Sequence, residues 1–529
     1  MFRTPAYHSS TESSPSEEGK GTREGKREGA PTTSAARDPA PRIERLRVSV
    51  LSTDQSLSVA TDESYELVVD APTSRIEAPT VFGALRALET FAQLVERVDG
   101  GESSENVDAA EDNEEAAAAD DGGNQRRRRH KHRKPHRHHH HKHHRHHKRK
   151  GHKRDVGASR FFVPASSVFD VPRFAHRGTL VDSARHFLPL DVIFSHLDAM
   201  EASKMNVLHW HLSDDQAFSV SLPGAPELAA KGGALDGRLI YSRDDVAGVV
   251  AAARERGIRV IPELDAPAHS GSWSKGAPEG ATMPCYDERT GRPQEGAFIS
   301  FPLPPPPHEG GNKLILTNFF FHPKHKKKTG EGAPPPLLDP SSEAAYDVLW
   351  RALRGAAELF PDSKLHVGGD EVDLGCWRGS ARVREWAEKQ QTETPSAGSD
   401  GRGAGSRPST RDPIEQAFAA FVSRAVGMTA AAGRAAVVWQ EAFEAGADLP
   451  PTAEVEVWKW WEGRGGGPPS DDATTAEAER AWRRALAAVT AAGHRAILAA
   501  PWYLNLGRRG HADWEEMCVF ESFSPFSSF

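Results

Sequence analysis

From residue 174 onward, short apolar runs alternate with longer amphipathic segments, and this alternation restricts the fold more than any other feature. Each run suits one buried strand, and each longer segment places its apolar residues at helical spacing. Repeated strand-then-helix units over this length predict a parallel sheet, with an eight-stranded (β/α) TIM-type barrel as its expected closed form. The expected strands are 178–181, 206–212, 258–263, 364–367, 435–439, 454–458 and 495–499. The expected helices include 190–204, 243–256, 343–360, 414–432 and 476–492.

A shorter α+β pattern precedes the barrel region. Residues 48–51 and 65–69 are expected strands, and residues 80–95 carry apolar side chains at helical spacing. We therefore expect a small α+β domain over 42–100 together with 158–172, followed by a barrel domain over 173–521. Because only seven barrel strands are evident, we expect this barrel to lack its eighth strand.

Several segments contain too few large apolar residues to repay the entropy of ordering. Residues 1–41 are rich in Ser, Glu, Gly and Lys, and residues 101–157 are first acidic and then almost wholly Arg, Lys and His. Inside the barrel domain, 296–336 is rich in Pro and basic residues, and 392–412 is rich in Gly, Ser and Arg. We expect disorder in the first two segments and surface insertions in the last two.

The basic run at 126–154 holds 12 of the 25 histidines. Clustered histidines can bind transition metals, and clustered Arg and Lys can bind nucleic acid or other polyanions. The run has neither regular ligand spacing nor interleaved aromatic residues. We therefore expect a disordered insertion, with no defined metal site and no specific nucleic-acid partner.

Polar and aromatic residues follow the carboxyl ends of the expected barrel strands, where barrel enzymes place their active sites. Acids with one Arg and one His suit a sugar ligand when aromatic rings lie beside them, because rings stack on pyranose faces while charged groups hold hydroxyls and move protons. In chain order the candidates are Asp182, Arg185, Asp214, Asp265, His269, Asp370, Glu371, Trp439, Trp458, Tyr503 and Asn505.

The pair Asp370 and Glu371 follows two glycines at the end of an expected strand. Adjacent strand residues normally point to opposite faces, so both carboxylates can serve one pocket only if the backbone turns after Gly369. The double glycine allows that turn. The alternative interpretation is a strand end followed by a solvated acidic turn.

A set of motifs, in this order, resembles β-N-acetylhexosaminidases of the lysosomal type, which form glycoside hydrolase family 20. The resemblance covers most of 43–97 and 161–515. The matching motifs are Arg177-Gly178, Asp182 with Arg185-His186, residues 206–215, residues 262–265 with His269, and residues 366–372, 438–441 and 500–505.

The resemblance implies an exo-acting hydrolase whose substrate supplies the nucleophile from its own 2-acetamido group. Glu371 would be the general acid and then the general base, and Asp370 would orient the acetamido group. His269, oriented by Asp265, would help to set the proton affinity of Glu371. The implied substrate is a glycan ending in β-linked N-acetylglucosamine or N-acetylgalactosamine, and no metal or organic cofactor is implied.

The same resemblance implies the sugar-binding residues. Arg185 and Asp214 would bind ring hydroxyls. Trp439, Trp458 and Tyr503 would line the acetamido pocket, and Asn505 would lie near its floor.

Cysteine positions and targeting signals bear on the cellular compartment. Cys285 and Cys376 match positions that are paired in related enzymes, which implies a disulfide and a secretory, lysosome-like or extracellular location; two reduced cysteines are the alternative. Cys518 has no evident partner. Residues 1–23 contain no apolar stretch, so no signal peptide is predicted, and no run in the chain is long enough to span a membrane. Relatives dimerise, which makes a homodimer one expectation.

The C-terminal end departs from the family pattern. Family members continue into an eighth strand that carries a Trp and a Glu for the outer hydroxyls of the sugar, whereas the resemblance fades after about residue 521. Two function classes therefore stay open: an active N-acetylhexosaminidase, and a truncated or non-catalytic relative that binds carbohydrate or polyanions.

Overall fold

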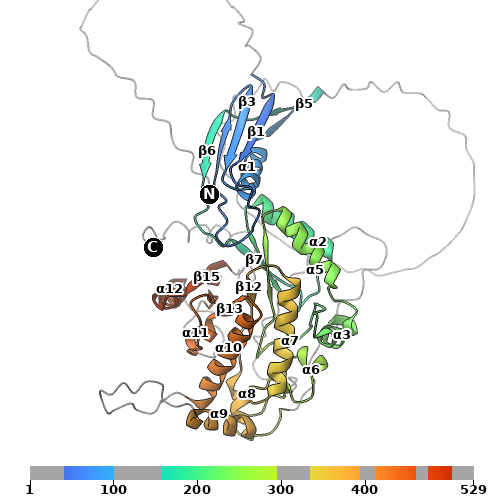
Figure 1. Ribbon diagram of the computed structural model, residues 1–529, viewed down its shortest axis with the longest axis vertical. Helices are drawn as coiled ribbons and strands as arrows, with labels where there is room; N and C mark the ends of the chain where they lie inside the picture. The colour runs from blue at the N-terminus through green and yellow to red at the C-terminus, as the bar shows by residue number, and fades with distance from the viewer. Residues whose placement is uncertain (1–40, 101–156, 295–333, 394–411, 460–474, 503–529) are drawn as a thin grey trace, which may run out of the picture.

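The computed structural model describes residues 41–100, 157–294, 334–393, 412–459 and 475–502 (Figure 1). Apart from a few terminal residues, the segments predicted to be disordered or inserted lie outside these ranges. A small four-stranded sheet and a larger seven-stranded sheet organise the described chain.

The larger sheet is parallel and curls into a half-barrel, with the strand order β15-β14-β13-β12-β9-β8-β7. Strands of this sheet that follow one another along the chain are therefore also neighbours in the sheet, as expected for repeated β/α units. All seven strands predicted from the sequence are present. They are β7 Gly178–Asp182, β8 Val207–His211, β9 Arg259–Glu263, β12 Lys364–His366, β13 Ala435–Trp439, β14 Glu454–Val457 and β15 Arg495–Leu498.

Helices cover the outer face of this sheet, and local signals set where they begin. Ser242 and Asp245 form a reciprocal capping box at the start of α5, and Asp412 caps α10 ahead of Pro413. Trp210 of β8 points outward and packs against Tyr241 and Phe360 in the main core. The long helices are α2 Leu190–Ala202, α5 Arg243–Glu255, α7 Glu343–Leu359, α10 Pro413–Ala431 and α12 Thr475–Ala491.

Shorter elements fill the connections on the barrel side. The helices are α3 Pro226–Gly232, α4 Ala234–Gly237, α6 Trp273–Gly276, α8 Leu374–Gly379, α9 Ala381–Glu393, α11 Gln440–Glu444 and the 3-10 turn Ala500–Trp502. The strands β10 Thr282–Met283 and β11 Leu337–Leu338 form an antiparallel pair.

The small sheet has the order β1-β3-β2-β6 and packs α1 on one face through residues such as Leu67, Ile76 and Ala87. Its β2–β6 pair, and the separate β4–β5 pair, join parts of the chain on either side of 101–156. The sequence pattern showed only two of these strands and the helix. The elements are β1 Arg45–Val50, β2 Tyr65–Val69, β3 Thr73–Ala78, α1 Val81–Gln93, β4 Glu96–Gly100, β5 Gly157–Phe162 and β6 Ser166–Asp170.

Buried polar contacts around Glu63 and Arg86 of the small domain join it to the barrel side. Arg86 of α1 donates from Nε to Glu63 (2.8 Å) and from its terminal nitrogens to backbone carbonyls at Met205 and Gly257 on the barrel side. Glu63 also accepts from Arg177 (2.7 Å), which precedes β7. These contacts fix α1 against the end of the barrel opposite the carboxyl ends of the strands.

Among the described helices, none combines the length and apolar character needed to cross a membrane.

Candidate active site

The turn that follows β12 brings two carboxylates to one side of the chain. Gly368 and Gly369 adopt φ values of 71° and 96°, which L-residues rarely adopt, and Glu371 is itself at 49°. The Gly369 N–H donates to Asp265 Oδ1 (3.1 Å), so the loop after β9 holds the turn after β12. The backbone thus turns after β12, as the double glycine was expected to allow.

His269 lies between the two carboxylates. Its Nε2 is 3.5 Å from Glu371 Oε2 and 3.6 Å from Asp370 Oδ2. The Glu371 side chain is 53% exposed, whereas that of Asp370 is 14% exposed. The two neighbouring acids therefore meet different environments, which is how paired carboxylates come to play different roles.

The other side of the imidazole faces a third acid. His269 Nδ1 is 3.4 Å from Asp214 Oδ1, and His269 Nε2 is 3.9 Å from Asp265 Oδ2. Asp214 is thus nearer than Asp265, which the sequence analysis expected to orient the ring. Burial disfavours a charged imidazole, but the carboxylates of Asp370, Asp214 and Asp265 outweigh it and raise the pKa of His269 well above its usual value. His269 therefore carries a positive charge at neutral pH.

Asp265 lies closer to the backbone of Gly369 than to the imidazole of His269. It is fully buried, and its Oδ1 accepts the Gly369 N–H while its own N–H donates to Ser213 Oγ (3.1 Å). Burial and the charge of Asp370 raise the pKa of Asp265 well above its usual value.

Arg185 reaches the site from the loop after β7. Its guanidinium contacts Asp182 Oδ2 (3.0 Å) and Asp214 Oδ2 (2.8 Å), and its side chain stays 41% exposed. Asp214 is 1% exposed, so its oxygens contact Arg185, His211 and His269 instead of solvent. Despite its burial, these cations lower the pKa of Asp214. Asp214 is placed to orient Arg185 and His269, and Arg185 is placed to contact a ligand.

Beneath this layer, one buried carboxylate lies within ion-pair distance of three histidines inside the half-barrel. Glu263 is fully buried and lies 2.7 Å from His209 Nε2, 2.9 Å from His211 Nδ1 and 3.3 Å from His366 Nδ1. Burial alone would favour the neutral acid, but the three imidazoles lower the pKa of Glu263 well below its usual value. The result is a charged, hydrogen-bonded floor under the carboxylate pair.

His209, Glu263 and His366 also have the residue types of a metal site. Two ligands of a tetrahedral zinc ion lie roughly 3.3 Å apart, given bond lengths of about 2.0–2.2 Å. The 2.7 Å between His209 and Glu263 is instead the length of a direct charge-assisted hydrogen bond. We interpret this cluster as an ion-pair network around Glu263, and the expectation that no metal is bound stays untested.

Two tryptophans form an aromatic wall beside the carboxylates. Trp439 ends β13 and Trp458 follows β14, and their ring centroids lie 6.3 Å apart at 68°. Trp439 donates from Nε1 to Glu263 Oε1 (2.7 Å). The remaining predicted pocket residues, Tyr503 and Asn505, lie outside the described part of the chain.

The predicted disulfide between Cys285 and Cys376 is present. It joins the loop after β10 to α8, which begins shortly after the Asp370 and Glu371 pair. This confirms the pairing implied by the family resemblance. Cys518 lies outside the described residues.

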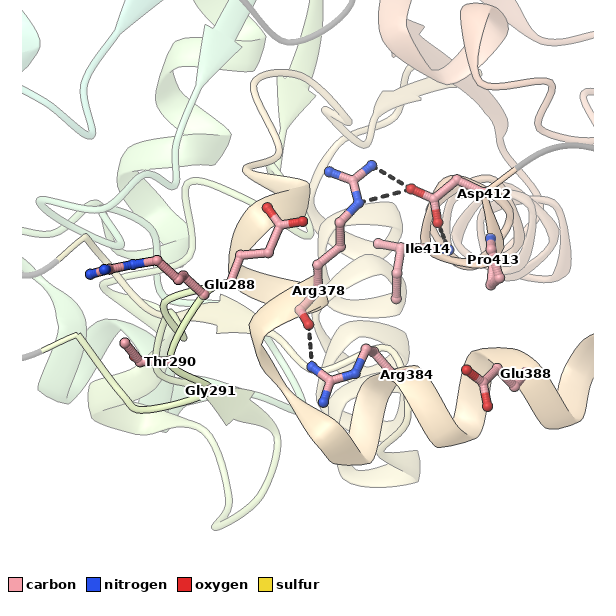
Figure 2. A pocket seen from close by; sticks show the side chains of 10 residues that line it. Glu288, Thr290, Gly291, Arg378, Arg384, Glu388, Asp412, Pro413 and Ile414 are labelled. Carbon is pink, nitrogen blue, oxygen red and sulfur yellow. Dashed lines mark hydrogen bonds and ion pairs between the residues drawn. The ribbon is translucent and has the colours of Figure 1, made fainter.

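A cavity of about 600 Å³ lies away from these groups, near α8, α9 and the start of α10 (Figure 2). Arg378 on its wall makes a bidentate ion pair with Asp412, and Arg384 donates to the Arg378 carbonyl. Glu288 and Glu388 also line it, so both signs of charge are present. We assign the functional site by the chemistry at the strand ends and not by this cavity.

Sequence reasoning assigned no role to several residues that build the site. His209, His211, Glu263, His366 and Glu441 stood within the quoted motifs, and Glu456 joined them only in space. The period of two along β8 was an available signal, because His209 and His211 must point to the same face of the strand. Which partner they would meet was not visible in the sequence.

The curled parallel sheet, with adjacent carboxylates, a charged histidine and two tryptophans at its carboxyl edge, defines a barrel protein of the glycoside hydrolase type. A family model described as "Glycosyl hydrolase family 20, catalytic domain" matches residues 174–529, and one described as "beta-acetyl hexosaminidase like" matches residues 4–94. The chain belongs to glycosyl hydrolase family 20.

Curated relatives extend the comparison. The chain is 29% identical over 477 residues to human beta-hexosaminidase subunit beta, covering 90% of this chain and 61% of the relative. It is 29% identical over 468 residues to beta-hexosaminidase subunit alpha of Bos taurus, covering 88% of this chain and 63% of the relative. The chain thus spans about three-fifths of the length of these relatives.

Solved structures support the fold. A chitobiase from Flavobacterium johnsoniae superposes with a TM-score of 0.56 at 22% identity, covering 89% of this chain and 53% of the other. An exo-β-N-acetylglucosaminidase from Vibrio harveyi, in complex with N-acetylglucosamine, superposes with a TM-score of 0.53 at 18% identity, covering 86% of this chain and 51% of the other.

Proposed function

We propose that this protein is an exo-β-N-acetylhexosaminidase, which removes terminal β-linked N-acetylglucosamine or N-acetylgalactosamine from glycans with retention of configuration. The observation that carries this proposal is the placement of Asp370 and Glu371 on one imidazole, at 3.6 and 3.5 Å. Two carboxylates that meet one imidazole can act on the same side of a bound sugar, one at the leaving oxygen and one at the acetamido group. They suit a mechanism in which the acetamido oxygen of the substrate attacks the anomeric carbon.

Glu371 is the proposed general acid. In the free protein, a hydrogen bond from His269 lowers the pKa of Glu371 and outweighs its partial burial. A bound sugar would cover the exposed half of the side chain, and the loss of water raises the pKa of a carboxyl group. Substrate binding would thus protonate Glu371, which then protonates the leaving oxygen and later takes a proton from water.

Asp370 is the proposed partner of the acetamido group. Its carboxylate would accept from the acetamido N–H and stabilise the positive charge that develops as the oxazolinium-like intermediate forms. The charged His269 keeps Asp370 ionised against the burial that raises its pKa. Arg185, oriented by Asp182 and Asp214, would bind ring hydroxyls, and Trp439 and Trp458 would line the acetamido pocket with Tyr503. Asn505 would complete the pocket floor.

The partners and location follow from the same proposal. The proposed partner is a glycan with a terminal N-acetylhexosamine, and the reaction needs neither a metal nor an organic cofactor. The disulfide between Cys285 and Cys376 supports a secretory, lysosome-like or extracellular location, where such bonds persist. A homodimer stays a prediction.

The test is hydrolysis of a chromogenic aryl N-acetyl-β-glucosaminide by the full chain. We expect turnover that Glu371→Gln and Asp370→Asn each reduce by about 100-fold or more. Glu358→Gln is the matched control, because Glu358 pairs with Arg243 on the exposed surface of α7 and should leave turnover unchanged. Folded wild-type protein that binds N-acetylglucosamine without turnover would favour the carbohydrate-binding alternative and overturn the proposal.

A further inference from the structure

Each tryptophan of the aromatic wall donates its indole N–H to a carboxylate behind it. Trp439 Nε1 donates to Glu263 Oε1 (2.7 Å), and Trp458 Nε1 donates to Glu441 Oε2 (2.8 Å). Glu441 follows Trp439 by two residues, at the start of the short helix α11. The proposed chemistry uses Asp370 and Glu371 and gives Glu441 no part.

The environment of Glu441 explains why it can hold an indole firmly. Its side chain is 16% exposed, and its Oε1 lies 3.2 Å from Lys459 Nζ, which is 4% exposed. Lys459 also contacts Glu444 Oε2 (2.9 Å), and its backbone N–H donates to Gln440 Oε1 (3.2 Å). These contacts tie the residues that follow Trp458 to α11. Burial raises the pKa of Glu441 to about 7 although Lys459 opposes the shift, and a carboxyl oxygen can accept the indole N–H in either protonation state.

We propose that Glu441 is a positioning residue, which fixes the indole plane of Trp458 through Nε1 and so sets the shape of the acetamido pocket, with Glu263 acting in the same way on Trp439. This inference rests on the proposed function. A tryptophan side chain turns about two bonds, and a hydrogen bond at Nε1 selects one orientation of its ring. Without it, the wall can tilt while the rest of the sheet stays in place.

The position of this wall matters because the acetamido group would be the nucleophile. A wall that holds the acetamido group against Asp370 brings the acetamido oxygen to the anomeric carbon. Misplacement of a reacting group by about 1 Å can cost roughly 100-fold in rate. A loosened Trp458 should therefore reduce kcat more than it raises KM, since the sugar ring would still bind through Arg185.

The test is a double-mutant cycle on the full chain with the chromogenic N-acetylglucosaminide. Glu441→Met removes the acceptor at similar size, and Trp458→Phe removes the indole N–H but keeps a ring. We expect each variant to reduce kcat by about 10- to 100-fold. The kcat of the double variant should equal that of the less active single variant. Glu441→Gln keeps an acceptor oxygen and should restore much of the loss. Independent effects that multiply in the double variant would overturn the proposal.

Glu444→Met is the matched control. It changes the same residue type in the same helix and removes the other carboxylate from Lys459, but it leaves the Glu441 to Trp458 hydrogen bond intact. We expect its kcat to stay within about twofold of the wild type, since surface-facing substitutions away from the reacting groups have small effects. A loss equal to that of Glu441→Met would show that Lys459, and not Trp458, mediates the effect.

A second readout separates this inference from the proposed function. With 5-fluorotryptophan incorporated, the 19F resonance that disappears in Trp458→Phe identifies Trp458. We expect Glu441→Met to shift or broaden that resonance and N-acetylglucosamine to restore it in part. This holds whether or not the wild type turns over. An active wild type with an unchanged Trp458 resonance in Glu441→Met would reject the positioning role alone.

Discussion

Gly368 lies directly against the carboxylate of Asp265, so closely that a Cβ atom at position 368 would overlap Asp265 Oδ1. The same oxygen accepts the N–H of Gly369. Because Gly368 also has a φ of 71°, two independent reasons require glycine there. The orientation of Asp370 and Glu371 thus depends on how tightly two loops from neighbouring strands meet.

We expect Gly368→Ala to lower the free energy of unfolding by about 2–4 kcal/mol, because it adds backbone strain to a steric overlap with a buried group. Activity on the chromogenic substrate should fall further than stability explains, since Asp265 must move away from Gly369. Gly427→Ala is the control: Gly427 lies within α10 with open space where a Cβ would stand, and alanine there should stabilise by about 0.5–1 kcal/mol. Guanidinium unfolding followed by circular dichroism compares the two. Equal stabilities would contradict the tight contact.

The buried Glu456 should make stability depend on pH. Burial raises its pKa from 4.5 to about 7, so the folded protein binds this proton more tightly than the unfolded chain does. Its contribution is therefore most favourable below pH 4.5 and is lost as pH rises through 7, by about 3 kcal/mol in total. We expect Glu456→Gln to make the fall in unfolding free energy between pH 5 and pH 7.5 shallower. If the unfolding free energy of Glu456→Gln fell between pH 5 and pH 7.5 by as much as that of the wild type, Glu456 would not be the source of the pH dependence.

Glu63, which pairs with Arg86 in the small domain and with Arg177 before β7, should hold the small sheet to the barrel. Glu63→Ala leaves Arg86, which is 2% exposed as a side chain, without its carboxylate. Removing one member of a buried pair costs about 3–5 kcal/mol. Glu66→Ala is the control, because its 3.1 Å pair with Arg75 is about half-exposed and should contribute less than about 1 kcal/mol. If calorimetry gave both variants the same melting temperature, the pair would not be the joint between the two parts.

The disulfide should stabilise the loops around the site. Cys285 and Cys376 are 91 residues apart, and closing a loop of that length contributes about 3–5 kcal/mol through the unfolded chain. We expect a reducing agent to lower the unfolding midpoint of the wild type and to leave that of a Cys285→Ser, Cys376→Ser double variant unchanged. The double variant should already unfold at the lower midpoint. If the reducing agent lowered the unfolding midpoint of both proteins equally, the disulfide would not be the cause of the stabilisation.

Much of the fold followed from the sequence. Apolar runs such as 206–212 and amphipathic segments such as 343–360 have periods that belong to one kind of element, and repeated strand-then-helix units place consecutive strands next to each other in the sheet. The candidate residues were found for the same reason, since strand ends of a parallel sheet share one edge. The family resemblance supplied the Cys285 to Cys376 pairing, which spacing alone left open. Strands β4 to β6 were missed because their pairing joins parts of the chain on either side of 101–156, which no local pattern records.

The tertiary structure alone decided which of these residues act together. Asp214, not Asp265, lies closest to His269 Nδ1, because the turn after β12 takes the backbone of Gly369 to Asp265. The charged state of Glu263 depends on three imidazoles that reach it from other strands. Such contacts depend on how far each strand is shifted against its neighbour and on how loops turn at the sheet edge. Sequence periodicity records which face a side chain occupies, and the partners it meets there are set by packing.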